Sequence, residues 1–267
     1  MNECVGKASS SQVSQRHISF LESGRAKPSQ AMVLQLATVL EIPLRYQNMM
    51  LSAAGFAPIH TEIDLSAPEM SSIFKAIGFI LRQQEPYPAI VIDRYWNLLL
   101  ANKGATRLLN IFIDPDKLQT LFCIDGKINL MQAMFDPQGL RPFIADWEEL
   151  AVSLLQRVHR EANSSIESEQ SAFLFDELVS YPGVADLWNA SSRSQNVSVR
   201  EASASAEGES TQNDLILTTH LKKKDLDLRF FAMIATLVTP CDITLQEIRI
   251  ECLFPADEVT EKNWYLA

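Results

Sequence analysis

Three polar residues near the beginning of the chain, Gln15, Arg16 and Ser19, have a spacing that places them on one face of a helix. In the major groove of DNA, glutamine can form two hydrogen bonds with adenine, and arginine can do the same with guanine. Arg25 and Lys27 follow in a predicted exit turn, where positive side chains can contact phosphates. The pattern predicts a surface that reads DNA bases. An ordinary solvated helix face is the alternative interpretation.

A helix must position these side chains, and the sequence marks both of its ends. Ser14, which joins the candidate DNA-binding residues, can cap the N-terminus because its hydroxyl can accept a hydrogen bond from the first turn. Gly24 suits the left-handed position that follows a last helical turn. Val13, Ile18 and Leu21 supply an apolar stripe opposite the polar face.

Two more short helices are predicted downstream. Ser29 can cap the first, and its apolar face comprises Val33, Leu36, Ala37 and Leu40. Pro43 can begin the second at its first position, and Gly55 can end it. Three short helices with tight turns predict a small helical domain.

These helices resemble the last three of the lambda-repressor-like, XRE-type helix-turn-helix, with residues 13–28 in the place of the recognition helix and its exit turn. The residues that match the family pattern are Ile18, Glu22, Gly24 and Pro28. Residues 1–12 contain a serine run and cannot supply the earlier helices, so the helix that crosses the DNA backbone is expected to be missing. Either the true start lies upstream of Met1 or the domain has decayed.

Length and charge fit a two-part chain. The 267 residues have room for a small domain and a medium one, and the net charge is −10. Residues 1–50 contain five Lys and Arg against three Glu, a balance of +2, so the remainder carries −12. A mildly basic N-terminal segment followed by an acidic remainder fits a DNA-reading module joined to a sensor. It also fits a chain with no nucleic-acid role.

Several other classes of protein are disfavoured. The four cysteines and four histidines are scattered without metal-ligand spacing, which predicts free thiols and no metal site. No G-x-S-x-G, H-E-x-x-H, G-x-G-x-x-G or P-loop motif is present, so we expect no catalytic residue, no enzymatic activity and no cofactor. The apolar runs are too short for a membrane span and no leader is visible, which predicts a cytoplasmic protein.

The second part of the chain mixes helices and strands. A helix is predicted over 66–84, two strands around a turn over 88–102, and mainly helix over 103–180, with the clearest helix at 144–162. Residues 189–213 are polar and predict a flexible loop. Strands return at 215–221, 226–238 and 244–254. This order predicts an α+β domain with helices on one side of an antiparallel sheet.

The last strand alternates between apolar and charged residues. We expect the apolar set to face inward and the charged set, Glu247, Arg249 and Glu251, to face outward. The inward set comprises Ile248, Ile250, Cys252 and Phe254.

The element order resembles a PAS-type sensor, and three segments are similar to the ligand-binding domain of the MmyB-like transcription regulators. These segments are 86–97, 135–148 and 244–257, and residues 51–58 match the junction with the helix-turn-helix. The resemblance implies a bacterial one-component regulator that binds double-stranded DNA, with a sensor that holds a small, fatty-acid-like apolar molecule. Regulators of the helix-turn-helix type usually act as homodimers.

The predicted domains are a partial helix-turn-helix at 1–58, a linker and connecting helix at 59–85, and a PAS-like ligand-binding domain at 86–267. Candidate ligand-binding residues are Ile92, Leu98, Arg141, Trp147, Leu150, Phe230, Ile248 and Ile250. Plain core is the favoured alternative for each apolar candidate, and Arg141 can meet a ligand carboxylate but more often such an arginine pairs with a nearby acid or faces water. The alternative function is a ligand-binding or dimerising protein that has lost DNA binding.

Overall fold

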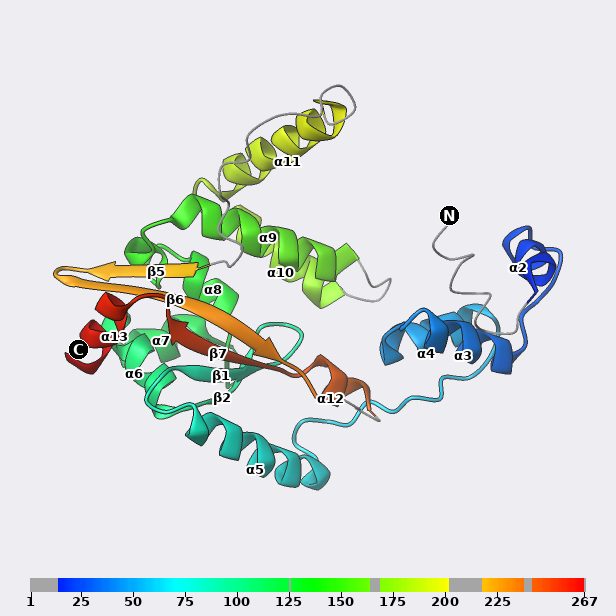
Figure 1. Ribbon diagram of the computed structural model, residues 1–267, viewed down its shortest axis with the longest axis horizontal. Coiled ribbons are helices and arrows are strands. Elements are labelled where there is room, and N and C mark those ends of the chain that lie inside the picture. Colours follow the sequence, from blue (N-terminus) through cyan, green and yellow to red (C-terminus); the bar gives the residue numbers. More distant parts are fainter. Residues whose placement is uncertain (1–13, 125, 164–168, 202–217, 238–241, 267) are drawn as a thin grey trace. The chain divides into compact units, whose positions relative to one another are not determined.

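The computed structural model describes residues 14–124, 126–163, 169–201, 218–237 and 242–266 (Figure 1). These residues form two compact units. The helical unit contains the residues up to Ser72 together with Thr236–Ile248, and the sheet unit contains Ile73–Ala235 together with Arg249–Ala267. The expected domain boundaries at 58 and 85 stay predictions.

The helical unit begins with three short helices, α2 (Gln15–Glu22), α3 (Gln30–Val39) and α4 (Leu44–Ala53). Both predicted serine caps are confirmed, because Ser14 accepts from the His17 N–H and Ser29 from the Met32 N–H, each at 3.3 Å. The two glycines also end their helices as predicted, with φ of +69° at Gly24 and +87° at Gly55. Pro43 differs by one position, since it is the N-cap and the helix starts at Leu44.

Helix α12 (Ile243–Glu247) completes the helical unit, although a strand was expected to begin at 244. That expectation is wrong because Asp242 caps a helical turn, accepting a hydrogen bond from the Thr244 N–H at 2.9 Å. The same carboxylate accepts from the Thr61 hydroxyl at 2.9 Å and the Ile63 N–H at 3.0 Å. Asp242 therefore holds α12 to the segment that follows α4.

The sheet unit contains a five-stranded antiparallel sheet in the order β2-β1-β7-β6-β5 (Figure 1). Its strands are β1 (Ala89–Ile92), β2 (Leu98–Ala101), β5 (Thr218–Lys223), β6 (Leu226–Ala235) and β7 (Arg249–Pro255). The predicted hairpin between β5 and β6 is confirmed, with Lys224 in the left-handed region at φ +54° in its turn. The α+β class is thereby confirmed.

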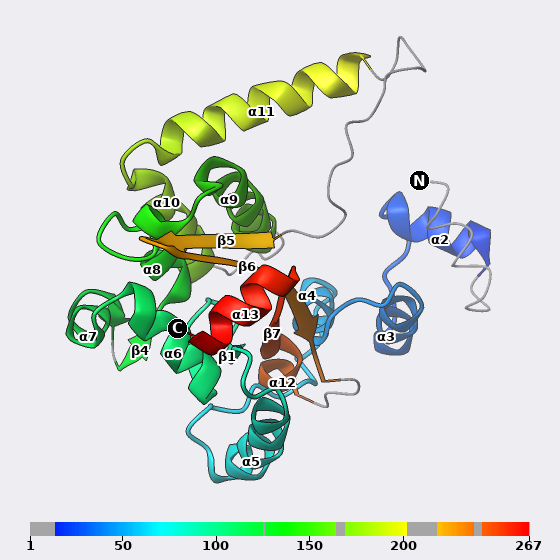
Figure 2. The same cartoon turned by 60° about the vertical axis from the view of Figure 1, so that its left-hand side comes forward.

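The helices that contribute side chains to the main apolar core of this unit are α6 (Lys103–Phe112), α7 (Pro115–Phe122), α8 (Leu130–Phe135), α9 (Trp147–Asn163), α10 (Glu169–Ser180), α11 (Val184–Glu201) and α13 (Glu258–Leu266). Helix α5 (Pro68–Gln83) lies outside that core and buries Met70, Ile77 and Leu81 elsewhere. A short hairpin, β3 (Cys123–Ile124) with β4 (Lys127–Ile128), and a 3-10 turn at Arg141–Phe143 complete the unit. Helix α13 lies against β6 and β7 (Figure 2), where Trp264 packs edge-on to Phe230 at 5.7 Å.

The predicted loop at 189–213 is wrong for its first part, because α11 continues to Glu201. The beginning of α11 is anchored by packing, since the Trp188 ring lies 4.9 Å from His159 and 5.2 Å from Phe175. Tertiary contacts of this kind override a polar local composition. The rest of the predicted loop lies outside the described residues.

Candidate ligand pocket and DNA-reading surface

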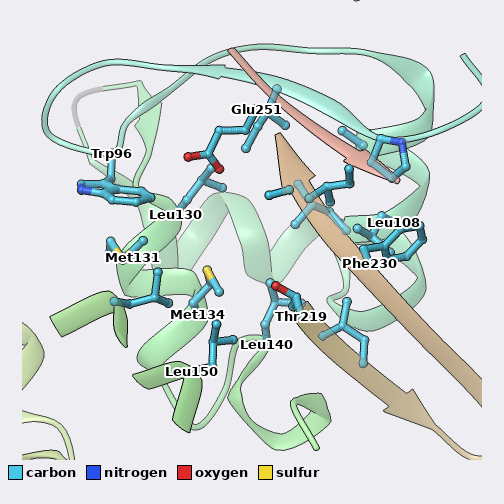
Figure 3. A pocket seen from close by; sticks show the side chains of 18 of the residues that line it. Trp96, Leu108, Leu130, Met131, Met134, Leu140, Leu150, Thr219, Phe230 and Glu251 are labelled. Atoms are coloured by element: carbon cyan, nitrogen blue, oxygen red, sulfur yellow. The ribbon is translucent and has the colours of Figure 1, made fainter. Parts of the chain in front are cut away.

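A cavity of about 490 Å³ lies in the sheet unit between the sheet and the helices α6, α8 and α9 (Figure 3). Its lining is predominantly aliphatic, with two methionines. The sheet contributes Ile90, Phe230, Ala232, Ile234 and Leu253, and the helices contribute Leu108, Leu130, Met131, Met134 and Leu150. A cavity of this volume and lining suits a small, mostly apolar ligand, and flexible methionines adapt to irregular shapes.

Only a few polar side chains reach this cavity: those of Arg157, Thr219 and Glu251, and the indole of Trp96. Arg157 comes from α9 and Glu251 from the central strand β7. The Trp96 N–H already donates to a carboxylate oxygen of Glu161 at 3.1 Å. The polar groups that a ligand can meet are therefore Thr219 and the pair formed by Arg157 and Glu251.

Trp96 organises the charged end of the cavity. Its backbone lies in the left-handed region at φ +67°, which is uncommon for a residue with a large side chain. Two guanidinium groups flank the indole ring, Arg157 at 4.3 Å and Arg249 at 4.7 Å from its centre. Glu161 binds Arg249 at 2.6 Å and lies 3.5 Å from Arg157. This cluster joins α9 to β7 at one wall of the cavity.

Burial disfavours the charged forms of Glu251 and Arg157. Burial raises the pKa of the Glu251 carboxyl, and the positive charges of Arg157 and Arg249 only partly offset this rise. Burial also lowers the pKa of the Arg157 guanidinium.

The prediction for the last strand is confirmed in the burial of Ile248 and Ile250, at 1 % and 2 % exposure, but it is wrong for Glu251, which was expected to face outward. The residues of β7 do alternate, but Glu251 and Leu253 line the cavity, while Ile250 is buried outside its lining. The strand register explains this, because Glu251 lies opposite Ile90 on β1 and Ile234 on β6, and both neighbours line the cavity. Ile248 belongs to the helical unit.

Of the eight predicted ligand-binding residues, the cavity brings together Leu150 and Phe230. Ile92 is buried in the core and Leu98 packs against it, but neither lines the cavity. Arg141 and Trp147 contact each other instead, with the guanidinium 4.7 Å from the ring, beside a separate shallow depression. Their roles in binding stay predictions.

Sequence reasoning missed Glu251 and Arg157. One signal could have found Glu251. The residues opposite it on the two neighbouring strands, Ile90 and Ile234, are apolar, so a carboxylate between them needs a polar partner from another element. Arg157 lies three residues after Leu154, on the helix face already expected to be buried. A charged residue on such a face is a candidate for a functional site.

The candidate DNA-reading residues lie together on α2 and the turn after it. All six, Ser14, Gln15, Arg16, Ser19, Arg25 and Lys27, are exposed. Within the part of the chain that the structure describes, no carboxylate pairs with Arg16, Arg25 or Lys27. A polar helix face with free cations beside it can approach a nucleic-acid backbone.

Among the described residues no group of side chains has the makings of a metal site, and no helix is long and apolar enough to cross a membrane. Cys123 and Cys252 are free thiols, as expected, whereas Cys4 and Cys241 lie outside the described residues.

Comparison with known protein families gives two matches. Residues 8–47 match a helix-turn-helix family, and residues 75–264 match the MmyB-like transcription regulator ligand binding domain. No curated protein matches the chain significantly. The second match covers more than half of the chain and contains every residue of the cavity. The chain therefore belongs to the MmyB-like transcription regulators, with a helix-turn-helix of the XRE type before the ligand-binding domain.

Proposed function

We propose that this regulator is a one-component switch, in which a small, fatty-acid-like apolar molecule in the sheet-unit cavity controls sequence-specific binding of operator DNA by α2. It acts as a homodimer in the bacterial cytoplasm and catalyses no reaction. The observation that carries the proposal is the cavity of about 490 Å³ with its aliphatic lining. Ligand pockets in proteins typically have this size and an apolar lining with few polar groups.

Native mass spectrometry of the purified full chain, followed by melting scans with fatty acids and fatty alcohols of graded length, tests the ligand. A molecule that binds only the folded state must raise its stability, by about 2.7 kcal/mol at a hundredfold excess over Kd. We expect a bound apolar molecule or a chain-length-dependent rise in Tm. If neither is observed, the cavity is merely core and the sensor proposal fails.

Selection of operators from random DNA, followed by binding assays across a salt series, tests DNA reading. Arg16→Ala should cost about 1–3 kcal/mol and relax specificity at one base pair. Lys27→Ala should weaken binding to all sequences alike and reduce the salt dependence. Lys117→Ala, which removes an exposed lysine from α7, is the matched control and should leave binding unchanged.

The two assays separate the proposal from its rival. A chain that binds an apolar ligand but selects no DNA sequence is the ligand-binding protein that has lost DNA binding. An Arg16→Ala protein with unchanged specificity would refute the assignment of α2 to the major groove.

A further inference from the structure

Glu251 is an unusual residue for its position. It lies in the middle of a row across the sheet, between Ile90 and Ile234, and all three line the cavity. Its side chain is only 13 % exposed. Figure 3 shows its carboxylate extending from the sheet toward Leu130 and Trp96, inside the cavity. An acid in an otherwise aliphatic wall costs free energy unless it has a partner.

The partner that the described residues provide is weak. Arg157 approaches with its Nη1 atom at 3.5 Å from Oε1 of Glu251. Charge-assisted hydrogen bonds between such groups are normally about 2.7–2.9 Å long. Arg157 is held back by the indole of Trp96 and by Glu161, which lies on the same helix. Glu251 therefore retains acceptor capacity that faces the cavity, because a carboxylate can accept several hydrogen bonds.

Among the described residues, the four charged groups that cluster at this end of the cavity balance one another. Arg157 and Arg249 carry two positive charges, and Glu161 and Glu251 carry two negative charges. A ligand carboxylate would bring a second negative charge next to Glu251, and a ligand ammonium would bring a third positive charge next to Arg157. A hydroxyl adds no charge, can donate to Glu251, and can accept from Arg157.

Building on the proposed function, we propose that the ligand is a mostly apolar molecule with an uncharged hydroxyl group at one end. Glu251 accepts the hydrogen bond of that hydroxyl, and the aliphatic walls of the cavity hold the rest of the molecule. This assigns Glu251 as the residue that selects a neutral donor over an anionic head group of equal chain length. Arg157 supplies the complementary donor to the hydroxyl oxygen.

The test compares three probes, each with a ten-carbon chain, on the full-length protein at pH 8: 1-decanol, decanoate and decyl methyl ether. Binding is measured by calorimetry and by the rise in Tm. We expect decanol to bind about tenfold or more tightly than decanoate, because juxtaposed like charges cost several kcal/mol. The ether should bind more weakly than decanol, because it cannot donate a hydrogen bond to Glu251.

The variant Glu251→Gln tests the residue itself. It removes the negative charge and adds an amide donor, so the preference for decanol over decanoate should fall to near unity. Glu258→Gln, an exposed acid on α13, is the control and should keep the wild-type preference. If Glu251→Gln does not fold, the order of the three probes on the wild-type chain decides the question alone.

The failure of this inference is distinguishable from failure of the proposed function. If decanoate binds wild-type protein as tightly as decanol or more tightly, the assignment of Glu251 is overturned while the apolar pocket stands. An equal affinity for decanol and its ether would also overturn it. If no probe binds and no molecule co-purifies, the proposed function fails, and this inference fails with it.

Discussion

Arg45 on α4 donates two hydrogen bonds to Glu247 at the end of α12, from Nε to Oε1 at 2.7 Å and from Nη2 to Oε2 at 3.0 Å. Arg45 also pairs with Glu62 in the segment after α4. These bonds, led by the one to Glu247, raise the pKa of Arg45 although burial opposes them. A bidentate pair of this kind fixes both distance and orientation.

The pair between Arg45 and Glu247 lies close in sequence to the strand that lines the cavity. Strand β7 begins at Arg249, and its residues Glu251 and Leu253 line the cavity. A ligand that shifts β7 acts within a few residues of the Glu247 carboxylate. Because only Ile248 separates Glu247 from β7, we expect the pair to take part in any coupling between ligand binding and the helical unit.

We expect Glu247→Gln to uncouple ligand binding from DNA binding. Ligand affinity should stay close to wild type, whereas the factor by which ligand changes operator affinity should shrink by about 0.5–2 kcal/mol of coupling free energy. The measurement is operator binding with and without ligand. Linkage provides an internal check, because saturating DNA must change ligand affinity by the same factor.

The matched control is Glu62→Gln, which removes the other carboxylate from the same arginine. Glu62 is 55 % exposed, and exposed pairs contribute only about 0–1 kcal/mol. Equal losses of coupling in the two variants would show that Glu247 has no special part in transmission.

Filling the cavity should abolish the response to ligand. Ala232 lines the cavity on β6, and Ala232→Trp places an indole there. The ligand-induced stabilisation, about 2.7 kcal/mol at a hundredfold excess over Kd, should disappear in melting scans. Met233→Trp is the control, because Met233 is the next residue on the strand, does not line the cavity, and is 59 % exposed. A persistent shift in Ala232→Trp would place the ligand elsewhere.

Local rules explain why the helix-turn-helix was predictable. Ser14 and Ser29 cap helices, and Gly24 and Gly55 end them, because each position needs a particular side-chain acceptor or a positive φ. These requirements act over three or four residues, so they are readable without knowledge of the rest of the fold.

The cavity was harder to predict because its polar end is built from distant segments. Period-two alternation showed that β7 is a strand, but alternation alone does not say which face meets the helices. Glu251 faces them because its register places it opposite Ile90 and Ile234, which line the same cavity. Among the predicted residues, Leu150 and Phe230 line the cavity because they lie on large apolar faces of α9 and β6.

Glu251 should make stability depend on pH. Because burial raises its pKa, the folded state favours the protonated carboxyl, and the stability it contributes is complete below about pH 4.5, the ordinary value. That contribution is lost as pH rises through the folded-state pKa. Glu251→Gln, which cannot ionise, should therefore gain stability relative to wild type between acidic and neutral pH in denaturant titrations. Glu258→Gln should show the same dependence of unfolding free energy on pH as wild type. If Glu251→Gln also shows the wild-type pH dependence, burial does not raise the pKa of Glu251.

Helix α5 should form the homodimer contact. Two of its apolar side chains, Phe79 at 63 % and Ile80 at 44 % exposure, face solvent in the single chain. Regulators with a helix-turn-helix bind two half-sites as dimers, so a second copy is the expected cover for this face. Phe79→Glu with Ile80→Glu should give monomers in light scattering at tens of micromolar. Operator affinity should then fall by about 10²–10⁴-fold, because the second half-site is no longer held nearby.

Leu121→Glu on α7, at 41 % exposure, changes a comparable exposed side chain and should leave the dimer intact. A dimer that survives the α5 substitutions would exclude this helix as the contact.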